Sequence, residues 1–117
     1  MYTIKKQFTF SASHQLLGLP VEHQCARLHG HNYIVEVELR DNELNEVGFV
    51  KDYGELTYIK SFIDTQLDHR HLNDVFVENP TAENMARVLF NKFVAIYPQL
   101  AAVHVSETPK TWATYSA

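Results

Sequence analysis

Residues 25–39 have the sequence CARLHGHNYIVEVEL, in which one cysteine precedes two histidines and an alternating apolar run. Side chains two positions apart on a β-strand point to the same face of a sheet. The apolar positions that share the parity of His29 and His31 are Tyr33, Val35, Val37 and Leu39. The run therefore predicts a long strand over Asn32–Arg40 whose buried face also receives both imidazoles.

The N-terminal residues predict a second long strand. Ile4, Phe8 and Phe10 alternate with polar residues over residues 2–10, which is the pattern of a half-buried strand. If this strand continues past Phe10, Ala12 and His14 stay on its apolar side. Three histidines, His14, His29 and His31, would then converge from two strands.

This histidine cluster favours a metal site. A buried imidazole needs partners for its ring nitrogens, and neighbouring histidines can share a metal ion. His14, His29 and His31 match the three nitrogen donors of a catalytic zinc that keeps its fourth position open. The same donors would also accept iron, cobalt or nickel. A single buried histidine is more often a hydrogen-bonded core residue, so the prediction depends on the cluster.

Cys25 is open to three interpretations. It could close the metal site as a fourth, structural ligand, or it could be a small buried hydrophobe. It could also be a thiolate that Arg27 stabilises and that removes a proton from carbon. Structural zinc sites usually use several cysteines, and this chain has one. The open site with a free Cys25 is therefore favoured, and an internal disulfide is excluded.

Two further places carry titratable side chains in unusual settings. Asp68 directly precedes His69, and a carboxylate that orients an imidazole is a common acid–base arrangement. Glu107 continues the apolar row of Val103 and Val105, where a carboxylate is unusual. Glu107 could form an ion pair within the sheet, or its two oxygens could bind the N–C–N edge of a pterin or guanine ring.

The remaining pattern predicts an α+β fold with one domain over residues 1–117. Helical periodicity spans about residues 53–67 behind an Asp52 N-cap, and a second helix follows Thr81 and ends near Tyr97. Further strands are expected at Val47–Val50, pairing back as a hairpin, at 101–108 and at 111–115. Helices should then cover one face of an antiparallel sheet.

Composition narrows the class of partners. The formal charge of −4 argues against general nucleic-acid binding, which usually requires clustered Lys and Arg. No stretch approaches the roughly 18 apolar residues of a membrane span, and the N-terminus lacks signal-peptide features. The expectation is a cytoplasmic protein that binds neither nucleic acid nor membrane.

Several of these motifs together resemble the family of 6-pyruvoyl-tetrahydropterin synthase and 6-carboxy-5,6,7,8-tetrahydropterin synthase. The resemblance spans almost the whole chain. The matching pieces are Phe10–His14, Cys25–His31, Gly48–Asp52, Leu67–His69, Asn79–Asn84 and Glu107–Thr108.

The resemblance implies a fold and a set of roles. The fold is the tunnelling fold, a four-stranded antiparallel sheet with two helices on one face, in which subunits join into a barrel and form a homohexamer as a dimer of trimers. The implied site residues are the zinc ligands His14, His29 and His31, the catalytic thiol Cys25, the proton-transfer unit Asp68 and His69, and the pterin anchor Glu107.

The three residues between Cys25 and His29 resemble the carboxy branch of the family, because the pyruvoyl branch usually has a longer gap. The implied reaction converts 7,8-dihydroneopterin triphosphate to 6-carboxy-5,6,7,8-tetrahydropterin in queuosine biosynthesis and releases acetaldehyde and triphosphate. Two alternatives stay open: pyruvoyl-tetrahydropterin synthesis, and a non-catalytic zinc-stabilised module that binds a pterin or purine.

Overall fold

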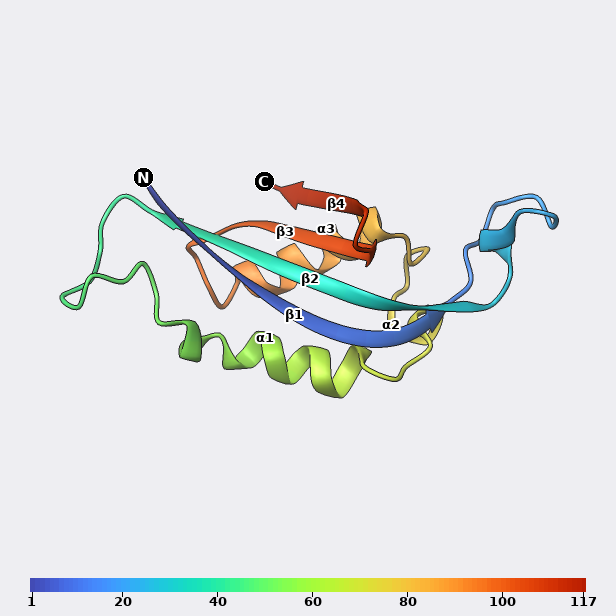
Figure 1. The fold of residues 1–117 in the computed structure, drawn as a ribbon, viewed down its shortest axis with the longest axis horizontal. Helices are drawn as coiled ribbons and strands as arrows, with labels where there is room; N and C mark the ends of the chain where they lie inside the picture. Colours follow the sequence, from blue (N-terminus) through green and yellow to red (C-terminus); the bar gives the residue numbers. More distant parts are fainter.

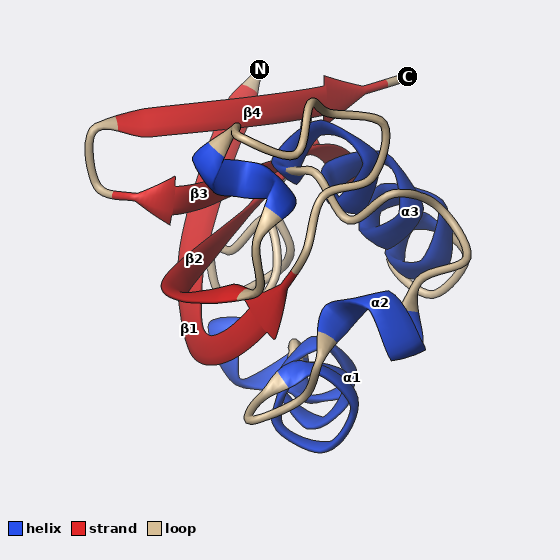
Figure 2. Ribbon diagram, turned by 90° about the vertical axis from the view of Figure 1, so that its right-hand side faces the viewer, coloured by secondary structure: helices blue, strands red, loops and turns tan.

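The computed structural model describes residues 1–117 as a four-stranded antiparallel sheet with helices on one face (Figures 1 and 2). The strand order is β1-β2-β3-β4. The strands are β1 (Tyr2–His14), β2 (His29–Asp41), β3 (Leu100–Thr108) and β4 (Thr111–Ser116). The α-helices are α1 (Thr57–Phe62), α2 (Leu72–Val75) and α3 (Ala82–Val94). The predicted α+β class, with helices on one side of an antiparallel sheet, is confirmed.

The pairing of β1 with β2 is the longest in the sheet. It runs without a register shift from Tyr2 opposite Asp41 to His14 opposite His29. The predicted strand over residues 2–10 is thus confirmed, and it continues to His14, which was the condition for this histidine to join the other two. The second strand starts at His29, three residues before the predicted start, because its histidines already pair with Ala12 and His14.

Strand alternation directs one face of the sheet into the core. The buried residues of β1 and β2 include Phe8, Phe10, Tyr33, Val35 and Val37. Helix α3 covers the β3–β4 half of this face with the buried side chains Met85, Ala86, Leu89, Phe90 and Phe93. None of the helices has the length and apolarity that a membrane crossing requires.

The predicted helix over 53–67 is present but changes type along its length. A 3-10 turn (Tyr53–Glu55), α1 and a π-helical turn (Ile63–Leu67) follow one another. Asp52 caps the first turn as predicted, because its carboxylate accepts a hydrogen bond from the Gly54 N–H. The π turn ends with the Asp68 N–H donating to the Ile63 carbonyl, and it delivers Asp68 to the edge of β1.

The predicted strand at Val47–Val50 is wrong. Asn45 folds these residues into a turn, since its Oδ1 accepts from the backbone N–H groups of residues 47, 48 and 49. Gly48 has φ of +97°, a left-handed conformation that is incompatible with a strand. The end of β2 pairs instead with the start of β3, where Leu39 lies opposite Leu100.

The connection that follows Leu67 is more ordered than its polar sequence predicts. It contains α2, and its first residues lie along the outer edge of β1. The Ser13 N–H donates to the Arg70 carbonyl, and the His69 N–H donates to the Ser11 carbonyl. The connection therefore supplies hydrogen-bond partners to backbone groups that an edge strand would otherwise leave unpaired.

The segment 15–28, which carries Cys25, lies at one end of the elongated molecule, and the turn at 42–50 lies at the other (Figure 1). The longest dimension is 55 Å and the two shorter ones are 24 Å. Because the three histidines occupy the last residues of β1 and the first residues of β2, they lie at the end that carries Cys25.

The cap of α3 gives a test of this fold. Thr81 accepts a hydrogen bond from the Asn84 N–H through its side chain. Replacing Thr81 with Ala removes the acceptor and should lower the free energy of unfolding by about 1 kcal/mol. Urea denaturation at fixed protein concentration measures this change. Thr81→Ser keeps the hydroxyl and should retain most of the stability, so equal losses in both variants would contradict the cap.

Candidate metal centre and active site

Three imidazoles meet on the core face of the sheet, where β1 ends and β2 begins. The ligand nitrogens of His14, His29 and His31 all lie within 4.8 Å of one another. His14 is fully buried and the other two are half-buried. The predicted convergence of three histidines from two strands is confirmed.

Hydrogen bonds to backbone carbonyls orient two of these rings. His14 Nδ1 donates to the Pro80 carbonyl oxygen at 2.8 Å, and His29 Nδ1 donates to the Arg27 carbonyl oxygen at 2.7 Å. A carbonyl can only accept, so these contacts assign the proton of each neutral ring to Nδ1. The Nε2 atoms of both rings then carry lone pairs, and they face each other at 2.9 Å.

Two lone pairs at this distance repel unless a cation lies between them. Protonation of His14 is disfavoured, because burial lowers its pKa despite the Pro80 contact. Burial likewise lowers the pKa of His31, whose Nε2 is buried and has no hydrogen-bond partner. Neutral, convergent imidazoles are the form that binds a metal ion, so the three side chains fit a three-histidine metal centre.

Cys25 lies beside this centre. It belongs to a 3-10 turn (Gln24–Ala26) whose N-cap, His23, accepts a hydrogen bond from the Cys25 N–H. The half-buried thiol lines a cavity of about 270 Å³ together with Gln24, His29 and His31. The group of side chains that converge closely enough for one ion consists of the three histidines alone. This arrangement favours the open site over the closed one with Cys25 as a ligand.

Glu107 approaches the centre from β3. Its Oε2 lies 3.5 Å from His31 Nε2, and its side chain is 25% exposed. Glu107 also borders a cavity of about 210 Å³ with Glu83 and Trp112. A carboxylate beside an indole ring can bind a planar heterocycle that carries N–H groups. No pattern in the sequence indicated that Trp112 would line this cavity.

The side chains of Asp68 and His69 contact each other, which their adjacency in the sequence alone could not establish. Asp68 Oδ2 lies 2.9 Å from His69 Nδ1, and Asp68 Oδ1 accepts from the Ser11 N–H at 2.9 Å. The Ser11 N–H and then the His69 imidazole hold the pKa of Asp68 below its usual range. His69 has a positive φ of 59°, a conformation that costs a non-glycine residue about 1–2 kcal/mol.

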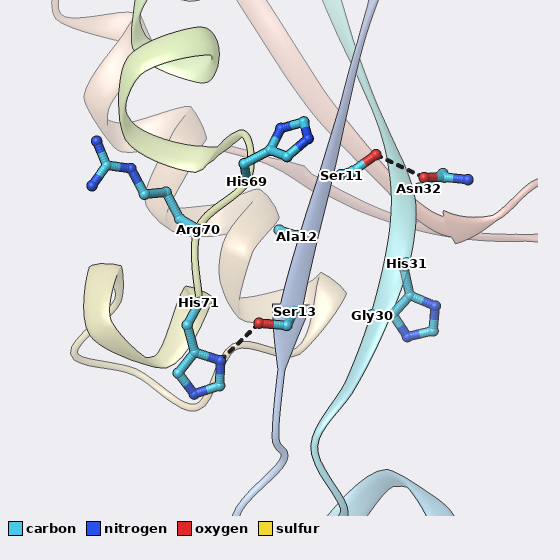
Figure 3. A pocket seen from close by; sticks show the side chains of 9 residues that line it. All are labelled: Ser11, Ala12, Ser13, Gly30, His31, Asn32, His69, Arg70 and His71. Atoms are coloured by element: carbon cyan, nitrogen blue, oxygen red, sulfur yellow. Dashed lines mark hydrogen bonds between the residues drawn. The ribbon is translucent and has the colours of Figure 1, made fainter.

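The pair lies beside the outer edge of β1 and does not line the cavity of Cys25. His69 borders a different depression of about 500 Å³, which also includes His31 and the face of β1 and β2 that bears Ser11, Ser13 and Asn32 (Figure 3). Figure 3 also shows Arg70 turned away from β1, where it donates to the Thr65 carbonyl. Within one chain, the structure thus gathers five predicted residues, His14, Cys25, His29, His31 and Glu107, and leaves Asp68 and His69 outside the cavity that Cys25 lines.

Sequence reasoning missed the groups that orient the histidines. The carbonyl oxygens of Arg27 and Pro80 hold His29 and His14, yet a backbone carbonyl has no signature in a sequence. Tyr33 was identified only as a buried strand residue. Its fully buried hydroxyl has no hydrogen-bond partner, and its ring centroid lies 5.4 Å from that of His31. Burial also raises the pKa of Tyr33.

Curated relatives cover nearly the whole chain. A 6-carboxy-5,6,7,8-tetrahydropterin synthase of a Synechocystis species is 37% identical, and the alignment covers 98% of this chain and 93% of the relative. The enzyme of the same name from Rickettsia typhi is 30% identical, with 86% and 83% covered.

Solved structures agree with this relationship. The 6-pyruvoyl tetrahydropterin synthase of Caenorhabditis elegans superimposes with a TM-score of 0.86 at 30% identity, covering 99% of this chain and 95% of that one. The Plasmodium vivax protein of that name shares the fold at 19% identity, with a TM-score of 0.73. The family model described as 6-pyruvoyl tetrahydropterin synthase matches residues 3–117. The chain therefore belongs to the 6-pyruvoyl tetrahydropterin synthase family.

Proposed function

We propose that the protein is a zinc-dependent 6-carboxy-5,6,7,8-tetrahydropterin synthase that acts in queuosine biosynthesis. Its substrate would be 7,8-dihydroneopterin triphosphate, and acetaldehyde and triphosphate would be released. The observation that carries the proposal is the convergence of three imidazoles beside a lone thiol and a carboxylate. Relatives named 6-carboxy-5,6,7,8-tetrahydropterin synthase support the choice of product.

In this proposal His14, His29 and His31 hold the zinc ion. When bound, the ion supplies Lewis-acid polarisation of the side-chain oxygens of the substrate. The carbonyls of Pro80 and Arg27 keep the two Nδ1–H groups engaged, so the Nε2 atoms stay directed at the ion.

The other residues would bind the pterin and move protons. The Glu107 carboxylate accepts hydrogen bonds from the N–H groups at one edge of the ring and thereby orients it. Cys25, next to His29 and His31, removes a proton from a side-chain carbon as a thiolate. Asp68 keeps the His69 imidazole oriented for the second proton transfer.

The proposal includes assembly into a homohexamer of two trimers. β4 and the part of β1 before Ser11 form the two outer edges of the sheet, and such edges have backbone groups available for pairing with another subunit. Joining of sheets across subunits would form the barrel of the tunnelling fold. It would also allow residues that lie apart in one chain, such as Cys25 and His69, to meet.

Product analysis tests the function. The purified protein is incubated with 7,8-dihydroneopterin triphosphate, with and without a chelator, and the products are identified by mass. The expected result is 6-carboxy-5,6,7,8-tetrahydropterin together with acetaldehyde, lost on chelation. Elemental analysis should find one zinc ion per chain before chelation and none afterwards. Formation of 6-pyruvoyl-tetrahydropterin would assign the other branch, and binding without any product would favour a non-catalytic module.

Cys25 gives the second test. Removal of a general base typically lowers turnover by about 10²–10⁴-fold, and Cys25→Ala should lower kcat within this range. The zinc content should stay at the wild-type level, since the three histidines are intact. A variant that loses its zinc would instead support Cys25 as a fourth, structural ligand.

Glu107 gives a test of pterin binding with a matched control. Glu107→Gln removes a charge-assisted interaction of about 1.5–3 kcal/mol, which corresponds to a rise in KM of about 10- to 150-fold. Glu83 borders the same cavity but lies on α3 and forms no ion pair with His31. Glu83→Gln should change KM by less than about twofold. Similar effects of both substitutions would argue against a specific role for Glu107.

A further inference from the structure

Two asparagine side chains bind the backbone that continues from β1. The Asn73 carboxamide accepts from the Gln15 N–H at 2.9 Å and donates to the Gln15 carbonyl at 2.8 Å. The Asn79 carboxamide binds Leu17 in the same way, at 2.9 Å and 3.0 Å. Each side chain thus satisfies both backbone groups of one residue, as a neighbouring strand would.

These contacts extend a regular pattern along the outer edge of β1. Ser11 and Ser13 bind the segment 68–71 through their backbone groups. Residues 15 and 17 follow at the same spacing of two, but here the side chains of Asn73 and Asn79 replace the backbone of a partner. The pairing therefore continues beyond the last residue of β1, into the segment that carries Cys25.

The clamped residues in turn hold the turn that bears the thiol. The Leu16 N–H donates to the Cys25 carbonyl at 3.0 Å, and Gln15 Nε2 donates to the Ala26 carbonyl at 2.9 Å. Residues 15–17 therefore lie between the asparagine clamps on one side and the Cys25 turn on the other. The Leu16–Cys25 hydrogen bond is the one backbone–backbone bond that joins residues 15–17 to the turn 24–26.

Both asparagines are themselves fixed. Asn73 belongs to α2, and Asn79 precedes the N-cap of α3. The Asn79 carbonyl accepts from Asn84 Nδ2 at 3.0 Å and from the Thr81 N–H at 2.8 Å. Groups held on rigid elements can fix a neighbouring loop more closely than the loop could fix itself.

We propose that Asn73 and Asn79 are positioning residues that hold the Cys25 thiol against the histidine cluster by clamping the backbone of Gln15 and Leu17. The inference rests on the proposed role of Cys25 in catalysis. The clamps restrict the motion of the Cys25 turn, which keeps the thiol within the cavity that His29 and His31 also line.

Asn→Asp substitutions test the clamps with almost no change of shape. An aspartate keeps the acceptor but replaces the donor with an oxygen, which then faces the carbonyl of Gln15 or Leu17. Hydrogen exchange of residues 15–28 should become about tenfold faster in Asn73→Asp and Asn79→Asp, whereas β2 and β3 keep wild-type protection. Unchanged exchange in residues 15–28 would overturn the proposal.

The lone cysteine provides a second readout that does not depend on activity. At pH of about 9.5 an ordinary thiol is ionised, so the rate of alkylation by iodoacetamide reports access to Cys25. This rate should rise about tenfold in each clamp variant. Asn73→Ser and Asn79→Ser remove the clamp without adding charge and should give the same increase. A rate equal to that of the wild-type protein in the serine variants would contradict the clamp.

Asn45→Asp is the matched control. Asn45 uses only its oxygen, which accepts three backbone N–H groups, and the turn at 42–50 to which it belongs lies at the opposite end of the molecule (Figure 1). An aspartate can make the same contacts, so exchange and alkylation near Cys25 should equal the wild-type values. Faster exchange in this control would attribute the effect to charge rather than to the clamps.

Steady-state kinetics connect the clamps to the reaction. With 7,8-dihydroneopterin triphosphate, the clamp variants should lose about tenfold in kcat, with KM within about twofold of wild type and zinc content unchanged. Loss of zinc, or a change confined to KM, would contradict a positioning role. If Cys25→Ala remains active, the proposed catalytic role of Cys25 is wrong. Faster exchange and alkylation in the Asn73 and Asn79 variants would still show that these residues position the Cys25 turn.

Discussion

The register of β1 against β2 is the constraint on which the rest of the site depends. His14 pairs directly with His29, and Ala12 pairs with His31, so all three imidazoles leave the sheet on its core face. A slip of one residue would move His14 to the opposite face and separate it from the other two rings. The alternating apolar residues further along both strands oppose such a slip, because it would expose Phe8 and Phe10 to water. The hydrophobic core thus determines the geometry of the polar centre.

The outer edge of β1 has a second role. The segment 68–80 binds the backbone of residues 11–17 along this edge, and its last residue reaches the buried His14. Through hydrogen bonds, Asp68 binds Ser11, the Asn73 and Asn79 carboxamides bind residues 15 and 17, and the Pro80 carbonyl binds His14. A substitution that displaces this connection would therefore alter the geometry of the metal centre, the thiol and the acid–base pair together.

The parts of the fold that the sequence predicted correctly are those in which the apolar residues recur with one clear period. Period-two alternation identified β1, β2 and β3, and its parity identified His14, His29, His31 and Glu107 as residues of the core face. The strand expected at Val47–Val50 failed because a single side chain, Asn45, binds three successive N–H groups and outweighs the strand propensity of two valines. Short apolar runs carry too little pattern to reveal such a competitor.

By itself the sequence determined the fold class, the convergent histidines, the lone thiol and the presence of a carboxylate in an apolar strand row. These follow from side-chain type and strand parity, which are local properties. Only the tertiary structure decided which backbone groups hold the rings, that Asp68 contacts His69, and that this pair lies apart from Cys25 within one chain. The Arg27 carbonyl and the Asp68–His69 contact are local but depend on backbone direction, whereas the Pro80 carbonyl on His14 and the Ser11 N–H on Asp68 come from residues distant in the sequence. These distant contacts arise when the connection between the helices closes along the edge of β1, and no local pattern encodes that contact.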